Sequence, residues 1–167
     1  MSIRRVRKRK VRKMAQEPVE LLLVEDNPSD VELVIHSLKK NNFANHIRVA
    51  RDGAEALDIM LGTGGDPLPA DSPKLILLDL KLPKVDGLQV LSRLKADPRT
   101  RGIPIVVLTS SREDRDLSEC YRLGANSYIV KPVDFTRFAE AVRQLGLYWL
   151  LLNEKPTFWH DPEEPGK

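Results

Sequence analysis

Carboxylate side chains follow two short apolar runs of the sequence. Glu25 and Asp26 come directly after Leu21–Val24, and Asp79 comes directly after Leu75–Leu78. An aspartate is ionised at neutral pH, because its reference pKa is ~3.9, so it can attack phosphorus without a general base. Three neighbouring carboxylates repel one another unless a cation neutralises them, and Mg²⁺ takes oxygen ligands of this kind. The pattern predicts a phosphoryl-accepting aspartate beside a magnesium site, provided that the two runs lie side by side.

A hydroxyl and an ammonium group stand at equivalent positions later in the chain. Thr109 follows the apolar run 105–108, and Lys131 follows Ser127–Val130. On the same edge of a sheet, both could bind the oxygens of a phosphoryl group on Asp79. Taken singly, Asp79 could be a capping residue, Thr109 a strand end and Lys131 a solvated lysine. The site prediction therefore depends on their joint placement.

Five short apolar runs alternate with amphipathic stretches of helical length. The runs are Leu21–Val24, Ile47–Ala50, Leu75–Leu78, 105–108 and Ser127–Val130, and the helical stretches begin at Asn27-Pro28 or cover Gly53–Leu61, Gly87–Ala96, 112–123 and the residues from Asp134. Continuous apolar runs are typical of strands buried on both faces. The alternation predicts an α/β fold, a five-stranded parallel sheet sandwiched by five helices. In the common order 2-1-3-4-5, strands one and three are neighbours where ligands bind.

Length and composition indicate one globular domain with short attachments. The chain has 167 residues, of which 41% are hydrophobic and 31% charged, so it can bury a core. We expect a domain over residues 19–153 with an extended C-terminal helix and a polar tail over 154–167. A long loop rich in Gly, Pro and Asp is predicted for residues 62–73.

The first residues carry most of the positive charge. Residues 1–13 contain eight Lys or Arg and no acid, which leaves 19 basic against 24 acidic residues and a net charge of −5 for the rest. Such a block is typical of a disordered tail over residues 1–18. It could bind nucleic acid, or it could result from a start codon placed too early, ahead of Met14. Neither a secretory signal nor an apolar run of membrane-spanning length follows, and the single cysteine suits a reducing compartment. We expect a cytoplasmic protein without a membrane partner.

Several motifs together resemble the receiver domain of two-component response regulators. They are Leu23-Val-Glu-Asp-Asn27, Leu77-Leu-Asp-Leu-Lys-Leu-Pro83 with Asp86-Gly87, Leu108-Thr-Ser110 and Val130-Lys-Pro132. Their order and spacing match the family from about Val19 to Leu147. The resemblance implies the flavodoxin-like receiver fold.

The resemblance also implies a role for each site residue. Asp79 would accept the phosphoryl group from a histidine kinase, with Mg²⁺ held by Glu25, Asp26, Asp79 and the backbone carbonyl of Lys81. Thr109 would be the switch hydroxyl and Tyr128 the aromatic residue whose rotamer reports the switch. Lys131 would pair with the phosphate and precede a cis bond to Pro132. Such a protein is no enzyme for a separate substrate, because its only chemistry is its own phosphorylation and dephosphorylation.

Three other classes of protein are less well supported by the residues. A phosphatase of the haloacid dehalogenase type needs a second acid two residues after its nucleophile, where this chain has Lys81. A receiver-like module that binds partners without phosphorylation would usually lack some of the acids, Thr109 or Lys131. A transcription factor would need a DNA-binding output domain, and too few residues flank the predicted domain, so we expect output through protein contacts.

Within this family, the chain resembles the stand-alone regulators encoded beside bacterial and cyanobacterial phytochromes. Shared features are Val24-Glu-Asp-Asn-Pro-Ser-Asp30, the loop before the third strand, Gly124-Ala-Asn-Ser-Tyr128 and Tyr148-Trp149-Leu-Leu-Leu152. The resemblance implies a bacteriophytochrome or cyanobacterial phytochrome as the kinase. The six successive apolar residues 147–152 exceed what one helix face can bury. We therefore expect a homodimer through the fourth and fifth helices and the fifth strand, with Tyr148, Trp149 and Leu151 near the interface; the alternative is that the segment folds back on its own domain.

Overall fold

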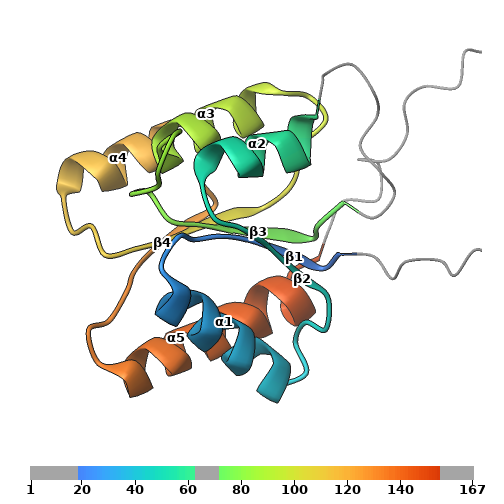
Figure 1. Cartoon of the computed structure of the whole chain (residues 1–167), viewed down its shortest axis with the longest axis vertical. Coiled ribbons are helices and arrows are strands. Elements are labelled where there is room, and N and C mark those ends of the chain that lie inside the picture. Colours follow the sequence, from blue (N-terminus) through green and yellow to red (C-terminus); the bar gives the residue numbers. More distant parts are fainter. Residues whose placement is uncertain (1–18, 63–71, 155–167) are drawn as a thin grey trace, which may run out of the picture.

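The computed structural model describes residues 19–62 and 72–154. Strands and helices alternate along the chain (Figure 1): β1 (Leu21–Val24), α1 (Pro28–Lys40), β2 (Ile47–Ala50), α2 (Gly53–Leu61), β3 (Leu75–Leu78), α3 (Gly87–Ala96), β4 (Ile105–Thr109), α4 (Asp114–Arg122), β5 (Ser127–Val130), α5 (Phe135–Gly146) and the π-helix η1 (Leu147–Leu152). The predicted basic tail, most of the predicted loop 62–73 and residues 155–167 of the predicted polar tail lie outside the described residues.

The five strands form one parallel sheet in the order β2-β1-β3-β4-β5, which confirms the predicted fold. The last residue of β1, Val24, is aligned with Leu78 at the end of β3. Thr109 at the end of β4 is aligned with Val130 at the end of β5. The residues that follow these strands therefore lie along one edge of the sheet, which we call the carboxyl edge.

Two helical layers cover the sheet. The helices α2, α3 and α4 lie on one face, and α1 and α5 lie on the other (Figure 1). The central strands β1, β3 and β4 are buried along their whole length. Because successive side chains of a strand point to opposite faces, Ile76 joins the core under α2 and α3, whereas Leu77 joins the core over α1 and α5. Within the described residues, no helix is long and apolar enough to cross a membrane.

Short polar side chains begin most of the helices at the carboxyl edge. Asn27, Asp52, Asp86 and Asp134 each accept a hydrogen bond from a backbone N–H of the first turn of α1, α2, α3 and α5. The helix α4 begins at Asp114, two residues later than predicted, because Glu113 has extended backbone angles and makes no side-chain cap. The edge that carries the candidate site is thus also the edge where these helices start.

The C-terminal helix is extended as predicted, and only some of its apolar side chains are buried. Phe138, Val142 and Leu145 are buried, whereas Phe135 is 69% and Leu152 is 61% exposed. Phe135 is the first residue of α5, at its free end. At the other end the backbone changes to a π-helix, whose hydrogen bonds run to the fifth residue before. This change alters the angular step between successive residues, so Leu152 does not lie on the face that buries Phe138, Val142 and Leu145.

Candidate phosphoacceptor site

Glu25, Asp26 and Asp79 converge at the carboxyl edge. One carboxylate oxygen of each lies within 4.8 Å of the others. Glu25 and Asp79 are buried, and Asp26 is exposed. The fold brings these acids together because β1 and β3 are neighbours that end in register. The three carboxylates predicted to form one site therefore do lie together.

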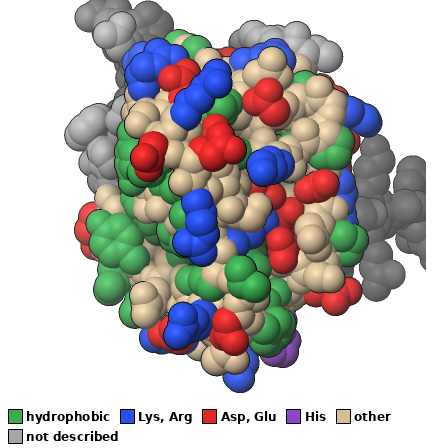
Figure 2. Space-filling model, turned by 90° about the vertical axis from the view of Figure 1, so that its left-hand side faces the viewer, with side chains coloured by type: hydrophobic (Ala, Val, Ile, Leu, Met, Phe, Trp, Pro, Cys, Tyr) green, Lys and Arg blue, Asp and Glu red, His purple; other side chains and the backbone are tan. Residues whose placement is uncertain are grey.

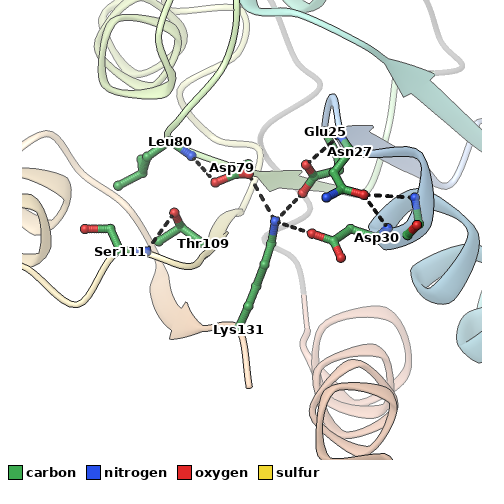
Figure 3. Close-up of polar contacts among 9 residues, drawn as sticks. Glu25, Asn27, Asp30, Asp79, Leu80, Thr109, Ser111 and Lys131 are labelled. Atoms are coloured by element: carbon green, nitrogen blue, oxygen red, sulfur yellow. Dashed lines mark hydrogen bonds and ion pairs between the residues drawn. The ribbon is translucent and has the colours of Figure 1, made fainter. Parts of the chain in front are cut away.

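The Lys131 side chain lies between carboxylates from three segments: the loop after β1, the first turn of α1 and the loop after β3 (Figure 3). Its Nζ is 2.5 Å from Glu25 Oε2, 2.9 Å from Asp30 Oδ2 and 3.0 Å from Asp79 Oδ2. The Lys131 side chain is 8% exposed, so water screens these ion pairs little. Each of its three N–H groups has one carboxylate acceptor.

Burial and the neighbouring charged groups both shift the pKa values of Glu25 and Lys131. Burial raises the pKa of Glu25 to about 7, assisted by the charge of Asp79 and opposed by the hydrogen bond from Lys131. Burial alone would lower the pKa of Lys131, but the hydrogen bond to Glu25 and the charges of Asp79 and Glu25 outweigh it and raise that pKa. With Asp26 and Asp30, four carboxylates face a single ammonium group. The set is short of positive charge, and its oxygen donors suit a hard cation such as Mg²⁺.

Asp79 is fixed through both of its carboxylate oxygens. Oδ1 accepts a hydrogen bond from the backbone N–H of Leu80 at 2.7 Å, and Oδ2 accepts one from Lys131. The start of α3 packs against the Asp79 backbone so closely that a Cβ on Gly87 would lie 2.2 Å from the Asp79 carbonyl oxygen. Only glycine fits there, and the loop after β3 is held tightly around the aspartate.

Thr109 lies on the other side of Asp79 from Glu25, at the end of the neighbouring strand (Figure 3). It is fully buried, and its Oγ1 accepts a hydrogen bond from the backbone N–H of Ser111 at 3.4 Å. Tyr128 packs against the core under α2 and α3, and its hydroxyl donates to the Ser111 carbonyl at 3.0 Å. Both residues predicted to act in a switch therefore contact the loop between β4 and α4. Their role as a switch stays a prediction.

The remaining predicted residues have different outcomes. Lys81 is exposed in the loop two residues after Asp79, and its carbonyl as a metal ligand stays a prediction. The expected cis bond after Lys131 is wrong: the structure has no cis peptide bond among its described residues, and trans is the lower-energy form of a proline peptide bond. Tyr148, Trp149 and Leu151 lie in η1, at the end of α5 away from the site.

Sequence reasoning missed two polar contacts beside the site. The motif Val24–Asp30 assigns no role to Asp30, although its position in the first turn of α1 places it at the carboxyl edge. Ser111 donates its hydroxyl hydrogen bond to Asp116 at 2.6 Å and so ties the loop after β4 to α4. The start of a helix that follows a site strand is the signal that could have identified Asp30.

Figure 2 shows the face of the molecule at the left of Figure 1, where the strands end. Acidic and basic side chains are interspersed across it, and apolar side chains gather in its lower part. This face of the molecule thus carries both charged and apolar groups.

Comparison with known proteins identifies the family. The family model described as response regulator receiver domain matches residues 21–143. The chain is 42% identical over 143 residues to the probable methanogenesis regulatory protein FilR2 of Methanothrix harundinacea (strain 6Ac), which covers 85% of this chain and 90% of that protein.

Solved structures of phytochrome-associated regulators are also similar. The phosphorylated cyanobacterial phytochrome response regulator RcpA has a TM-score of 0.76 at 36% identity, and the match covers 84% of this chain and 99% of that chain. The bacteriophytochrome response regulator AtBRR has a TM-score of 0.59 at 50% identity, over 83% of this chain and 100% of that chain. With the sheet order and the convergent acids described above, these matches show that the chain belongs to the response regulator receiver domain family of two-component signalling.

Proposed function

We propose that the protein is a response regulator that accepts a phosphoryl group on Asp79 from a histidine kinase and signals through protein contacts. The observation that carries the proposal is the placement of Asp79. Asp79 is a buried carboxylate that accepts a hydrogen bond from Lys131 and belongs to the group of three acids. Thr109 lies on its other side (Figure 3). This placement is stronger support than any of the residues taken singly.

The transfer step needs an aspartate oxygen that can reach phosphorus. Asp79 would attack the phosphorus of a phosphohistidine, forming an O–P bond while the P–N bond breaks and the imidazole leaves. Glu25, Asp26 and Asp79, with the Lys81 carbonyl, would hold Mg²⁺, which when bound supplies positive charge to the phosphoryl oxygens. Lys131 would exchange its contact with the Asp79 carboxylate for one with a phosphoryl oxygen, and the Thr109 hydroxyl would donate to another. No separate substrate is turned over, so we propose no enzyme activity beyond the protein's own phosphorylation and dephosphorylation.

The kinase that we propose as partner is of the phytochrome type. Support comes from the likeness to two solved structures. RcpA is a cyanobacterial phytochrome response regulator, and AtBRR is a bacteriophytochrome response regulator. We propose that the phosphoryl transfer takes place in the cytoplasm. For output we propose contacts of the apolar residues around α4 and η1, including pairing with a second copy.

The test is labelling of Asp79 in the full chain. Incubation with acetyl phosphate and Mg²⁺ should add one acid-stable, hydroxylamine-sensitive phosphoryl group to the wild type and none to Asp79→Asn, because the amide is a poor nucleophile. A matched control is Asp86→Asn, since Asp86 is an exposed helix cap outside the acid cluster. Equal labelling of Asp79→Asn and wild type would contradict the assignment and favour a binding module that works without phosphorylation.

A further inference from the structure

Asp30 makes an ion pair that the proposed phosphoryl transfer does not use. Its Oδ2 is 2.9 Å from Lys131 Nζ, and its side chain is 25% exposed. The Asn27 side chain accepts hydrogen bonds from the backbone N–H groups of Ser29 and Asp30, at 2.9 Å and 3.3 Å. Pro28 stands at the start of α1 and restricts the backbone further. Asp30 is therefore held on a rigid helix end beside the site.

The other two partners of Lys131 have a second task. Glu25 and Asp79 belong to the group of three acids that fits a cation, whereas Asp30 does not. Positive charge brought to Glu25 and Asp79 competes with Lys131 for the same oxygens. A buried ammonium group that lost both partners would be left unpaired, which is costly. Asp30 is the one carboxylate that Lys131 can keep.

We propose that Asp30 is a positioning residue that keeps Lys131 paired while Glu25 and Asp79 turn to the metal, and that it thereby raises the affinity of the acid cluster for Mg²⁺. The inference deepens the proposed function, because it concerns the same site. It differs from a general charge effect, since Asp30 acts through Lys131. Removing Asp30 should leave Lys131 bound more firmly to Glu25 and Asp79, so that Mg²⁺ competes less well.

The first test compares Mg²⁺ titrations of variants of the full chain, in which calorimetry measures the binding affinity. Asp30→Asn should lower the affinity for Mg²⁺ about fivefold, as expected for a coupling of about 1 kcal/mol between neighbouring charges. The matched control is Glu32→Gln, which removes one charge from an exposed residue of the same helix with no ion pair to Lys131. The control should change the affinity less than about twofold. Equal effects of the two variants would overturn the inference.

The second test repeats the comparison in a Lys131→Met background. If Asp30 acts through Lys131, Asp30→Asn should have no more effect there than Glu32→Gln. A full loss in both backgrounds would mean that Asp30 acts only as a nearby negative charge. Should Lys131→Met not fold, the first comparison still tests whether Asp30 raises the affinity for Mg²⁺, because equal effects of Asp30→Asn and Glu32→Gln would overturn the inference. Neither titration needs phosphorylation, so a failure of Asp79 labelling and a failure of this inference are separate results.

Discussion

The buried ammonium group of Lys131 balances the charge of the carboxyl edge. Replacing it in Lys131→Met would leave Glu25 and Asp79 buried without their cationic partner. We expect this variant to lose about 3 kcal/mol in free energy of unfolding without metal, and to recover part of it when Mg²⁺ is added. Denaturant unfolding with and without Mg²⁺ measures both. A loss that Mg²⁺ does not reduce would contradict the view that lysine and metal share the same carboxylates.

The same variant also tests the transmission of the signal. Lys131→Met should still accept some phosphate on Asp79 but show no phosphorylation-dependent change in partner binding or self-association. The reason is that a group shifts a conformational equilibrium only by binding one state better than the other, and Lys131 would bind the phosphorylated state. A full phosphorylation-dependent change in the variant would show that another residue transmits the signal.

Asp26 is the exposed member of the acid cluster, so it is the residue where metal binding can be tested with least damage to the fold. Asp26→Ala should weaken Mg²⁺ binding and phosphorylation of Asp79 together, while the free energy of unfolding without metal changes by less than about 0.5 kcal/mol. Mg²⁺ titration and labelling with acetyl phosphate provide the two measurements. An unchanged titration curve would exclude Asp26 as a ligand.

At the scale of single residues, the sequence predicts the acids of the site but not all of their contacts. Glu25 and Asp79 could be predicted to meet because each directly follows an apolar run and parallel strands end at one edge. The pairing of Lys131 with Asp30 joins residues 101 positions apart. It depends on the exact direction of the first turn of α1, which no local pattern of residues reports.

At the scale of elements, Lys95 connects three segments at the edge of the sheet opposite the site. Its Nζ donates hydrogen bonds to the carbonyls of Arg101 and Ile103 and to Asn126 Oδ1, at 3.1, 3.0 and 3.0 Å. Asn126 Oδ1 also accepts from the backbone N–H of Ile105 at 2.9 Å. The end of α3 is thus linked to the starts of β4 and β5.

Lys95→Met should therefore destabilise the fold without affecting the site. We expect a loss of about 2 kcal/mol in free energy of unfolding, because three oxygen atoms lose their donor, among them the partly buried carbonyl of Ile103, and we expect unchanged labelling of Asp79. Burial lowers the pKa of Lys95 from 10.5 to about 8. Between these values the unfolded chain binds the proton that the folded chain releases, so wild-type stability should rise with pH relative to the variant. Urea unfolding of both proteins at neutral pH and at about pH 9.5 measures this change. If the free energy of unfolding of the wild type, relative to that of the variant, fell as pH rises, the result would contradict the lowered pKa of Lys95.

Element boundaries could be predicted where burial decides them. The strands β1 and β3 begin and end where their apolar runs do, because both faces of each are covered by helices. The helix α4 begins two residues after the predicted start, and no capping side chain marks its first turn. The π-helical turn η1 was not predicted either, because its apolar residues are compatible with several helical periods. Periodicity cannot report a change of period inside one continuous apolar run.

At the scale of the whole molecule, exposed apolar side chains are unevenly distributed. Among the described residues, every large hydrophobic side chain counted as exposed lies between Leu117 and Leu152, in α4, in α5 with the loop before it, or in η1. Trp149 packs partly against the core over α1 and α5 and makes an edge-to-face contact with Tyr148, with ring centroids 5.1 Å apart. The segment thus folds back only in part. Tyr148 remains 52% and Leu151 58% exposed.

This distribution supports the predicted homodimer through α4, β5 and α5. A twofold interface uses the same surface on both copies, and the exposed apolar side chains of α4, α5 and η1 offer apolar area for such an interface. Leu151→Glu would place a charge in that interface. Sedimentation should therefore show a dimer for the wild type and a shift toward monomer for the variant. We expect the dissociation constant of the dimer to rise tenfold or more, and a tenfold change corresponds to ~1.4 kcal/mol. Gln89→Glu adds the same charge on the exposed face of α3 and should sediment as the wild type does. A wild-type protein that stays monomeric at every concentration, phosphorylated or not, would end the dimer hypothesis and leave Tyr148 and Leu151 as contacts for a different partner.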